Sequence, residues 1–253
     1  MLEEFLKLNI FVFFLIFARM GTVLMFIPGL GSTRIFARSR LFLALAISFL
    51  LTPILAGHLP ALPKTPIELG FLVAGEIVAG AFLGLVVRAM FTATQTAGVV
   101  IAFVSAMANT MVYDPVVEQQ SAVVAGFLGT IANLLLFVTN MHHLLIEAMV
   151  ESYNLFQPGI VFNIGDMVHL FARQIADTFK LGVQLASPFL VVSLAYYMGL
   201  GVLTRLEPQI PIFFVAMPLQ IVISIIVLAL TVGGIMVVFL SHVQDSLQPF
   251  IGS

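Results

Sequence analysis

The chain has 253 residues, of which 61% are hydrophobic and 9% charged, and its mean hydropathy is +1.16. These values lie far outside the range of soluble domains and predict an integral membrane protein. Ten basic and twelve acidic side chains give a formal net charge of −2, which argues against a nucleic-acid partner, and the absence of cysteine excludes disulfides and thiolate-ligated metals.

Hydropathy predicts an all-α, polytopic membrane protein, because a span must satisfy its backbone internally and no alternating strand pattern is visible. The predicted helices cover roughly residues 10–27, 41–56, 69–87, 91–111, 121–141, 183–203 and 212–240. Glu3 and Glu4 precede the first apolar run and no small-residue cleavage site follows it, so we expect a retained first span rather than a signal peptide. Residues 167–179 are typical of an amphipathic interfacial helix.

A simple serpentine topology fits this pattern only partly. Arg34, Arg38 and Arg40 crowd one short connection, which the positive-inside rule places in the cytoplasm. Arg205 then falls on the opposite side, and the last apolar segment, 212–240, is longer than one upright span.

One acidic side chain, Glu76, lies within the third predicted helix. Gly80 and Gly84 follow at helical spacing, so the acid shares a face with a strip of small residues that packs against protein. An uncompensated carboxylate at the bilayer centre would cost roughly 2.5 to 3.5 kcal/mol. A hydrogen-bonded packing residue, with Arg19 of the first span as a candidate mate, is favoured over the alternative of a small-solute or ion secondary transporter coupled through Glu76.

Other polar positions carry weaker signals. Gln95, in a threonine-rich stretch of the fourth predicted helix, fits inter-helix hydrogen bonding and a wet pore lining equally well. His142, His143 and Glu147 include an i, i+4 pair that could form half of a metal site, but no third ligand is evident and histidines at a span end commonly sit at the interface. No catalytic motif is present, and neither an enzyme nor a bound metal or cofactor is predicted.

A polar, turn-prone insert, residues 107–120, interrupts the apolar sequence and carries Asp114 and Glu118. Because apolar segments flank it, something other than lipid must surround it. Asp-Pro favours a turn anywhere, so an ordinary extramembrane turn and a functional loop are both open on these residues alone.

Four ordered segments resemble the FliR export-gate family, which is shared by flagella and type III secretion injectisomes. They read FARMGTVLMFIPGLG, GEIVAGAFLGLVVR, MVYDPVVEQQSAV and LTRLEPQIPIFFVAMPLQI, and the resemblance runs along essentially the whole chain. It implies a structural and gating subunit that joins FliP and FliQ in a helical export gate, near FlhB and FlhA. Unfolded flagellar proteins would cross the bacterial inner membrane through this gate at the flagellar basal body.

The resemblance also implies an internal organisation. Residues 1–180 would form a FliP-like part and 181–253 a FliQ-like helical hairpin, and FlhB is expected to be a separate chain because no N-P-T-H motif occurs. The plug loop of the family maps onto 107–120. Its implied members are Met107, Asn109, Thr110, Met111, Val112, Tyr113, Asp114 and Pro115, and the implied partner-contact residues are Arg205, Glu207, Pro208, Gln209 and Pro218.

A stopper of this composition has a physical rationale. Flexible thioethers and an aromatic ring can fill an irregular constriction and re-pack around varied passing chains. Met107, Met111, Val112 and Tyr113 would obstruct the channel, with Asp114 and Pro115 as the turn.

Overall fold

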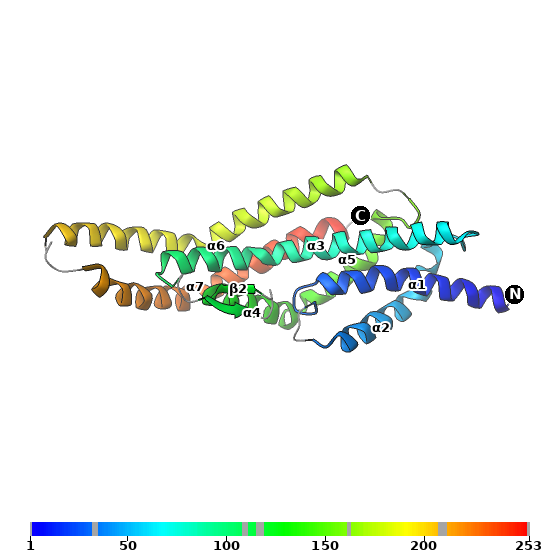
Figure 1. Cartoon of the computed structure of the whole chain (residues 1–253), viewed down its shortest axis with the longest axis horizontal. Coiled ribbons are helices and arrows are strands. Elements are labelled where there is room, and N and C mark those ends of the chain that lie inside the picture. Colours follow the sequence, from blue (N-terminus) through cyan, green and yellow to red (C-terminus); the bar gives the residue numbers. More distant parts are fainter. Residues whose placement is uncertain are drawn as a thin grey trace. The chain divides into compact units, whose positions relative to one another are not determined.

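The computed structural model describes residues 2–31, 35–107, 111–114, 119–160, 163–206 and 212–251. Within these residues the regular secondary structure is helical apart from one short pair of strands, which confirms the predicted all-α membrane class (Figure 1). The elements are α1 (Leu2–Phe26), α2 (Ala37–Leu55), η1 (Ala56–His58), α3 (Pro66–Val104), β1 (Met111–Asp114), β2 (Gln119–Ala122), α4 (Val123–Val138), α5 (Met141–Leu155), α6 (Ile164–Leu206) and α7 (Ile212–Ile251).

Several helices are longer than predicted. The predicted helices at 69–87 and 91–111 are one helix of 39 residues, α3, because the residues between them are ordinary helix formers. The amphipathic stretch at 167–179 and the span at 183–203 likewise merge into α6, 43 residues long, which contains Pro188. In both cases the polar residues between two apolar segments lie inside a continuous helix and do not mark a helix end. Conversely, the predicted helix at 121–141 begins with strand residues, and α4 starts only at Val123.

Four described helices are long and apolar enough to cross a membrane: α2, α3, α6 and, from Ala216, α7. Helices α4 and α5 together pass the same test but are bent by 76° at a short break, which makes them a broken span or a re-entrant pair. Asn140 at this break has φ 59°, a left-handed conformation that asparagine adopts more readily than most residues.

The described chain forms two compact units. The first comprises Met1–Met90, Phe137–Ile175 and Gln244–Ser253, and the second comprises Phe91–Leu136 and Ala176–Val243. Helices α3, α6 and α7 contribute residues to both. The division expected at residue 180, into a FliP-like part and a FliQ-like hairpin, is based on resemblance to other proteins and stays a prediction.

In the first unit, α1 and α3 approach closely through glycines. A Cβ on Gly80 would lie 2.6 Å from the Arg19 carbonyl oxygen, and a Cβ on Gly84 would lie 2.6 Å from Cβ of Phe26. The predicted strip of small residues therefore faces α1, and any larger side chain there would push the two helices apart.

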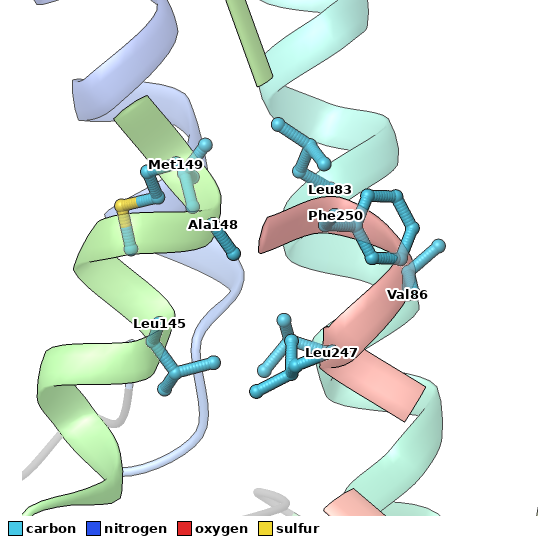
Figure 2. A pocket seen from close by; sticks show the side chains of 9 residues that line it. Leu83, Val86, Leu145, Ala148, Met149, Leu247 and Phe250 are labelled. Atoms are coloured by element: carbon cyan, nitrogen blue, oxygen red, sulfur yellow. The ribbon is translucent and has the colours of Figure 1, made fainter. Parts of the chain in front are cut away.

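A small gap of about 20 Å³ remains in this core. Figure 2 shows lining side chains from α3, α5 and the end of α7, and Val23 of α1 completes the lining. Water in a cavity needs two to four polar partners, and this lining is apolar, so the gap is a dry packing defect rather than a binding site. The lining residues are Val23, Leu83, Val86, Val87, Leu145, Ala148, Met149, Leu247 and Phe250.

The second unit uses the same packing device. A Cβ on Gly98 of α3 would overlap the backbone of Ala125 in α4, and a Cβ on Gly182 of α6 would lie 2.7 Å from Thr96. Phe91 and Phe239 add an edge-to-face contact with ring centroids 5.2 Å apart. Close backbone approach therefore holds α3, α4 and α6 together in this unit.

Gly98→Ala should destabilise the protein by about 1 to 3 kcal/mol, because the added methyl group must displace the α4 backbone. Thermal unfolding of the purified protein in detergent measures the loss. Gly233→Ala is the matched control, since a Cβ there would meet no atom within 4 Å. Equal transition temperatures for the two variants would contradict the packing argument.

Candidate functional site

The end of α3 is the point from which the insert departs. Ala106 has φ 58°, and the Met107 N–H donates to the Ala102 carbonyl oxygen at 2.9 Å, which is the outer hydrogen bond of a Schellman motif. A left-handed alanine costs roughly 1 to 2 kcal/mol, a strain that glycine would avoid. The helix thus ends sharply at Val104, before the predicted end at residue 111, and the chain turns directly into the insert.

The described part of the insert includes two paired backbone strands. Strands β1 and β2 pair antiparallel, with Met111 opposite Ala122 and Asp114 opposite Gln119 at the two ends of the register. The predicted plug residues from Met111 to Asp114 therefore lie on one strand, and Met107 lies at the helix exit. Asn109, Thr110 and Pro115 lie outside the described residues.

Gln220 of α7 fastens the end of α3. Its side chain is 5% exposed, and Nε2 donates to the Val104 carbonyl oxygen at 2.7 Å and to the Tyr197 hydroxyl oxygen at 3.0 Å. The Val104 carbonyl is one of the last four of α3, and these carbonyls receive no hydrogen bond from an N–H of the same helix. Nearby, the Tyr196 hydroxyl donates to the Ala216 carbonyl oxygen, so α6 and α7 are joined by a second polar contact.

Gln220 was not predicted as a site residue. A glutamine in the middle of an otherwise apolar helix was the available signal, because such an amide must find partners when it is buried.

The first unit contains a second polar cluster, centred on Arg19. Arg19 is fully buried and Glu76 is 1% exposed. Arg19 Nε donates to Glu76 Oε2 at 2.7 Å, and Nη2 donates to Glu76 Oε1 at 3.1 Å, which makes a bidentate pair. Nη1 donates to the Ser152 carbonyl oxygen at 3.2 Å, Nη2 donates to the Phe156 carbonyl oxygen at 2.7 Å, and the guanidinium carbon lies 3.8 Å from the centroid of the Tyr153 ring.

These contacts surround the guanidinium with negative charge from two sources. One is the Glu76 carboxylate. The other is the C-terminal end of α5, whose last carbonyls carry the negative end of the helix dipole. Arg19 thereby connects α1, α3 and α5, and Glu76 is engaged by a fixed cation rather than open to a transported ion. This geometry argues against the secondary-transport alternative.

The remaining predicted positions are dispersed. Gln95 is partly buried and lies against Gly129 of α4, where a Cβ would come within 2.8 Å of its Nε2 atom. Arg205 is exposed at the end of α6, and Pro218 is exposed within α7 rather than in the connection. Glu207, Pro208 and Gln209 lie outside the described residues.

The two adjacent histidines do not extend into a larger cluster. The rings of His142 and His143 have centroids 4.2 Å apart. Within the part of the chain that the structure describes, no three histidine, aspartate or glutamate side chains gather in a way that could hold a metal ion.

Removing both members of the buried pair should lower the free energy of unfolding by less than the sum of the two single losses. We expect Arg19→Leu and Glu76→Leu each to lose about 3 to 5 kcal/mol, because each leaves an uncompensated buried charge, and the double variant to lose clearly less than the sum. Chemical unfolding of the four proteins in mixed micelles measures this cycle. Arg38→Leu, at an exposed arginine, is the control and should stay within about 0.5 kcal/mol. Additive losses would show that the pair is not coupled.

Comparison with known proteins places these features in a family. Residues 10–246 match the family described as bacterial export proteins, family 1. The chain is 35% identical over 242 residues to the flagellar biosynthetic protein FliR of Caulobacter vibrioides, with 96% of each chain covered. It is 29% identical to FliR of Bacillus subtilis over 89% of this chain and 88% of that protein.

A more distant relative comes from a secretion system. The chain is 20% identical to the secretion system apparatus protein SsaT of Salmonella typhimurium, over 63% of this chain and 62% of that protein. Residues 10–246, which match the export-protein family, include α3, both strands and Gln220. The resemblance seen in the sequence is thereby confirmed, and the chain belongs to the bacterial export proteins of family 1.

Proposed function

We propose that this chain is the FliR-type structural and gating subunit of a flagellar type III export gate in the bacterial inner membrane, at the flagellar basal body. The observation that carries this proposal is the 35% identity to a flagellar FliR over 96% of both chains. The weaker and shorter similarity to SsaT, 20% over 63% of the chain, favours the flagellar system over an injectisome. In this role the chain is not an enzyme, and its partners supply the energy for transport.

The gating element of this proposal is the insert, with Met107, Met111, Val112 and Tyr113 as the stopper. Its backbone pairing satisfies part of its own hydrogen bonding, which lets a polar segment occupy a protein-lined channel where lipid is excluded. Buried side chains of these types contribute roughly 1.5 to 3 kcal/mol each, enough to keep a channel shut and little enough for an arriving chain to displace.

The base of the stopper is held by the end of α3. The Schellman motif at Ala106 fixes the direction in which the chain leaves the helix, and Gln220 ties the Val104 carbonyl to α7. In this proposal the hairpin moves on a rigid base, so opening involves the insert rather than the helices that carry it.

The partners in this proposal are several copies of FliP and FliQ, with FlhB and FlhA nearby and unfolded flagellar proteins as the cargo. Large apolar side chains cover the outward surface of α6 and α7 in the second unit. Examples are Val191, Leu194, Met198, Val222 and Leu230, which are 53 to 79% exposed. Such a surface suits neighbouring membrane helices, and the exposed Arg205 and Pro218 would lie at the edge of that contact.

Deleting residues 109–114 should leave assembly intact but open the channel to ions. We expect ion flux through reconstituted gates to rise by about ten-fold or more, because even one lost stopper side chain is worth about 1.5 kcal/mol. Flux into liposomes loaded with an ion-sensitive dye measures the leak at equal amounts of assembled complex. An intact barrier in fully assembled gates would overturn the plug assignment.

Gln220→Met should loosen the base of the stopper while keeping the length of the side chain. The variant loses both hydrogen bonds of Gln220 Nε2. The bond to Val104 is worth about 1 kcal/mol, so we expect the same flux assay to show a leak about five-fold above the wild-type level. Tyr197→Phe is the matched control, because it removes the second acceptor of Gln220 and keeps the contact to Val104. Equal leaks from the two variants would show that the hydrogen bond to Val104 does not limit the leak, and would contradict the anchoring role of Gln220.

A further inference from the structure

The first unit has a groove of about 510 Å³ formed by α1, α2 and α3. We call it the α1–α2 groove. Its lining is apolar apart from Thr22 and one charged side chain, Arg40. The lining residues are Phe14, Phe17, Ala18, Gly21, Thr22, Met25, Ala37, Arg40, Leu41, Ala44, Val73 and Ile77.

The charge in this groove lies at one end. Figure 1 shows α2 running back alongside α1, so Met25 and Ala37 lie at the end near the connection, whereas Phe14 and Ala44 lie farther along the helices. Arg40 is in the first turn of α2 and therefore belongs to the connection end. From Phe14 to Met25 the wall of α1 is about 16 Å long at 1.5 Å per residue. The groove thus has a cationic end and a long apolar remainder.

The surrounding sequence reinforces this polarity. Arg34, Arg38 and Arg40 fall within one short segment, and the sequence has no aspartate or glutamate from residue 5 to residue 67. Arg40 Nη2 donates to the Ile35 carbonyl oxygen at 3.4 Å, whereas Arg38 is exposed and does not line the groove. Planar guanidinium groups suit the geometry of phosphate oxygens, and basic pockets between membrane helices hold anionic lipid head groups.

We propose that the α1–α2 groove binds one anionic phospholipid, with its phosphate at Arg40 and an acyl chain along α1 toward Phe14. The volume lies in the range of roughly 300 to 1,000 Å³ that small-molecule sites occupy. The anionic end and the apolar tail of a phospholipid match the two ends of the groove. This site is separate from the insert and independent of its proposed gating role.

Native mass spectrometry of the full chain, purified in its assembly from membranes with a mild detergent, tests this proposal. Phosphatidylglycerol and phosphatidylcholine with identical acyl chains are the probes. We expect phosphatidylglycerol to be retained and to bind at least about five-fold more tightly than phosphatidylcholine, the difference expected for one basic side chain at the head group.

Three variants locate the site. Arg40→Gln should weaken phosphatidylglycerol binding by about five-fold, whereas Arg38→Gln, outside the groove, should leave it within about two-fold. Gly21→Leu should weaken binding of either lipid, because its side chain would occupy part of the groove. It keeps the fold, since a Cβ on Gly21 meets only the Phe17 ring, at 3.9 Å. If Arg40→Gln does not fold, Gly21→Leu alone decides between unchanged and weakened binding.

Three results would overturn the proposal. Equal binding of the two lipids would remove the role of charge, and unchanged binding in Gly21→Leu would place the lipid elsewhere. The third concerns a protein occupant. The chain contains no cysteine, so Gly21→Cys offers a unique cross-linking position, and its cross-linking to a neighbouring protein chain in the assembly would show that protein fills the groove.

Discussion

The burial of one guanidinium is the constraint on which the first unit depends. Arg19 has no access to solvent, and a buried cation costs several kcal/mol unless fixed negative groups surround it. The Glu76 carboxylate and the terminal carbonyls of α5 supply those groups. Because these partners come from two further helices, satisfying the charge also fixes where α3 and α5 lie against α1.

The glycine contacts follow from the same requirement. Arg19 can reach Glu76 with good geometry only if α1 and α3 are close, and Gly80 and Gly84 let the α3 backbone approach α1. In an apolar solvent the pairing of helices relies on close packing and hydrogen bonds, because lipid is as apolar as the helix surfaces. The charge pair and the small residues therefore together determine how α1 and α3 pair.

The sequence predicted the class of the protein, the main apolar segments and the helix face that carries Glu76, Gly80 and Gly84. These features rest on composition and local spacing. It did not predict that α3 and α6 are each one continuous helix, because a polar residue such as Arg88 lowers hydropathy without disfavouring a helix. The true end of α3 depends on the left-handed Ala106 and on Gln220, which lies 116 positions away from Val104 along the chain. The local sequence shows a glutamine in an apolar helix but does not show which distant carbonyl it contacts.

Helices α3, α6 and α7 are about twice as long as a membrane span requires. They contain 39, 43 and 40 residues, whereas about 20 residues suffice to cross the hydrocarbon layer. Each helix therefore either leans strongly or extends into the aqueous phase, and α7 is almost uncharged over its whole length. Apolar surface beyond the lipid must be covered by other proteins to stay out of water. A copy made in excess of its neighbours would then be a substrate for aggregation and proteolytic quality control, so its cellular amount is tied to theirs.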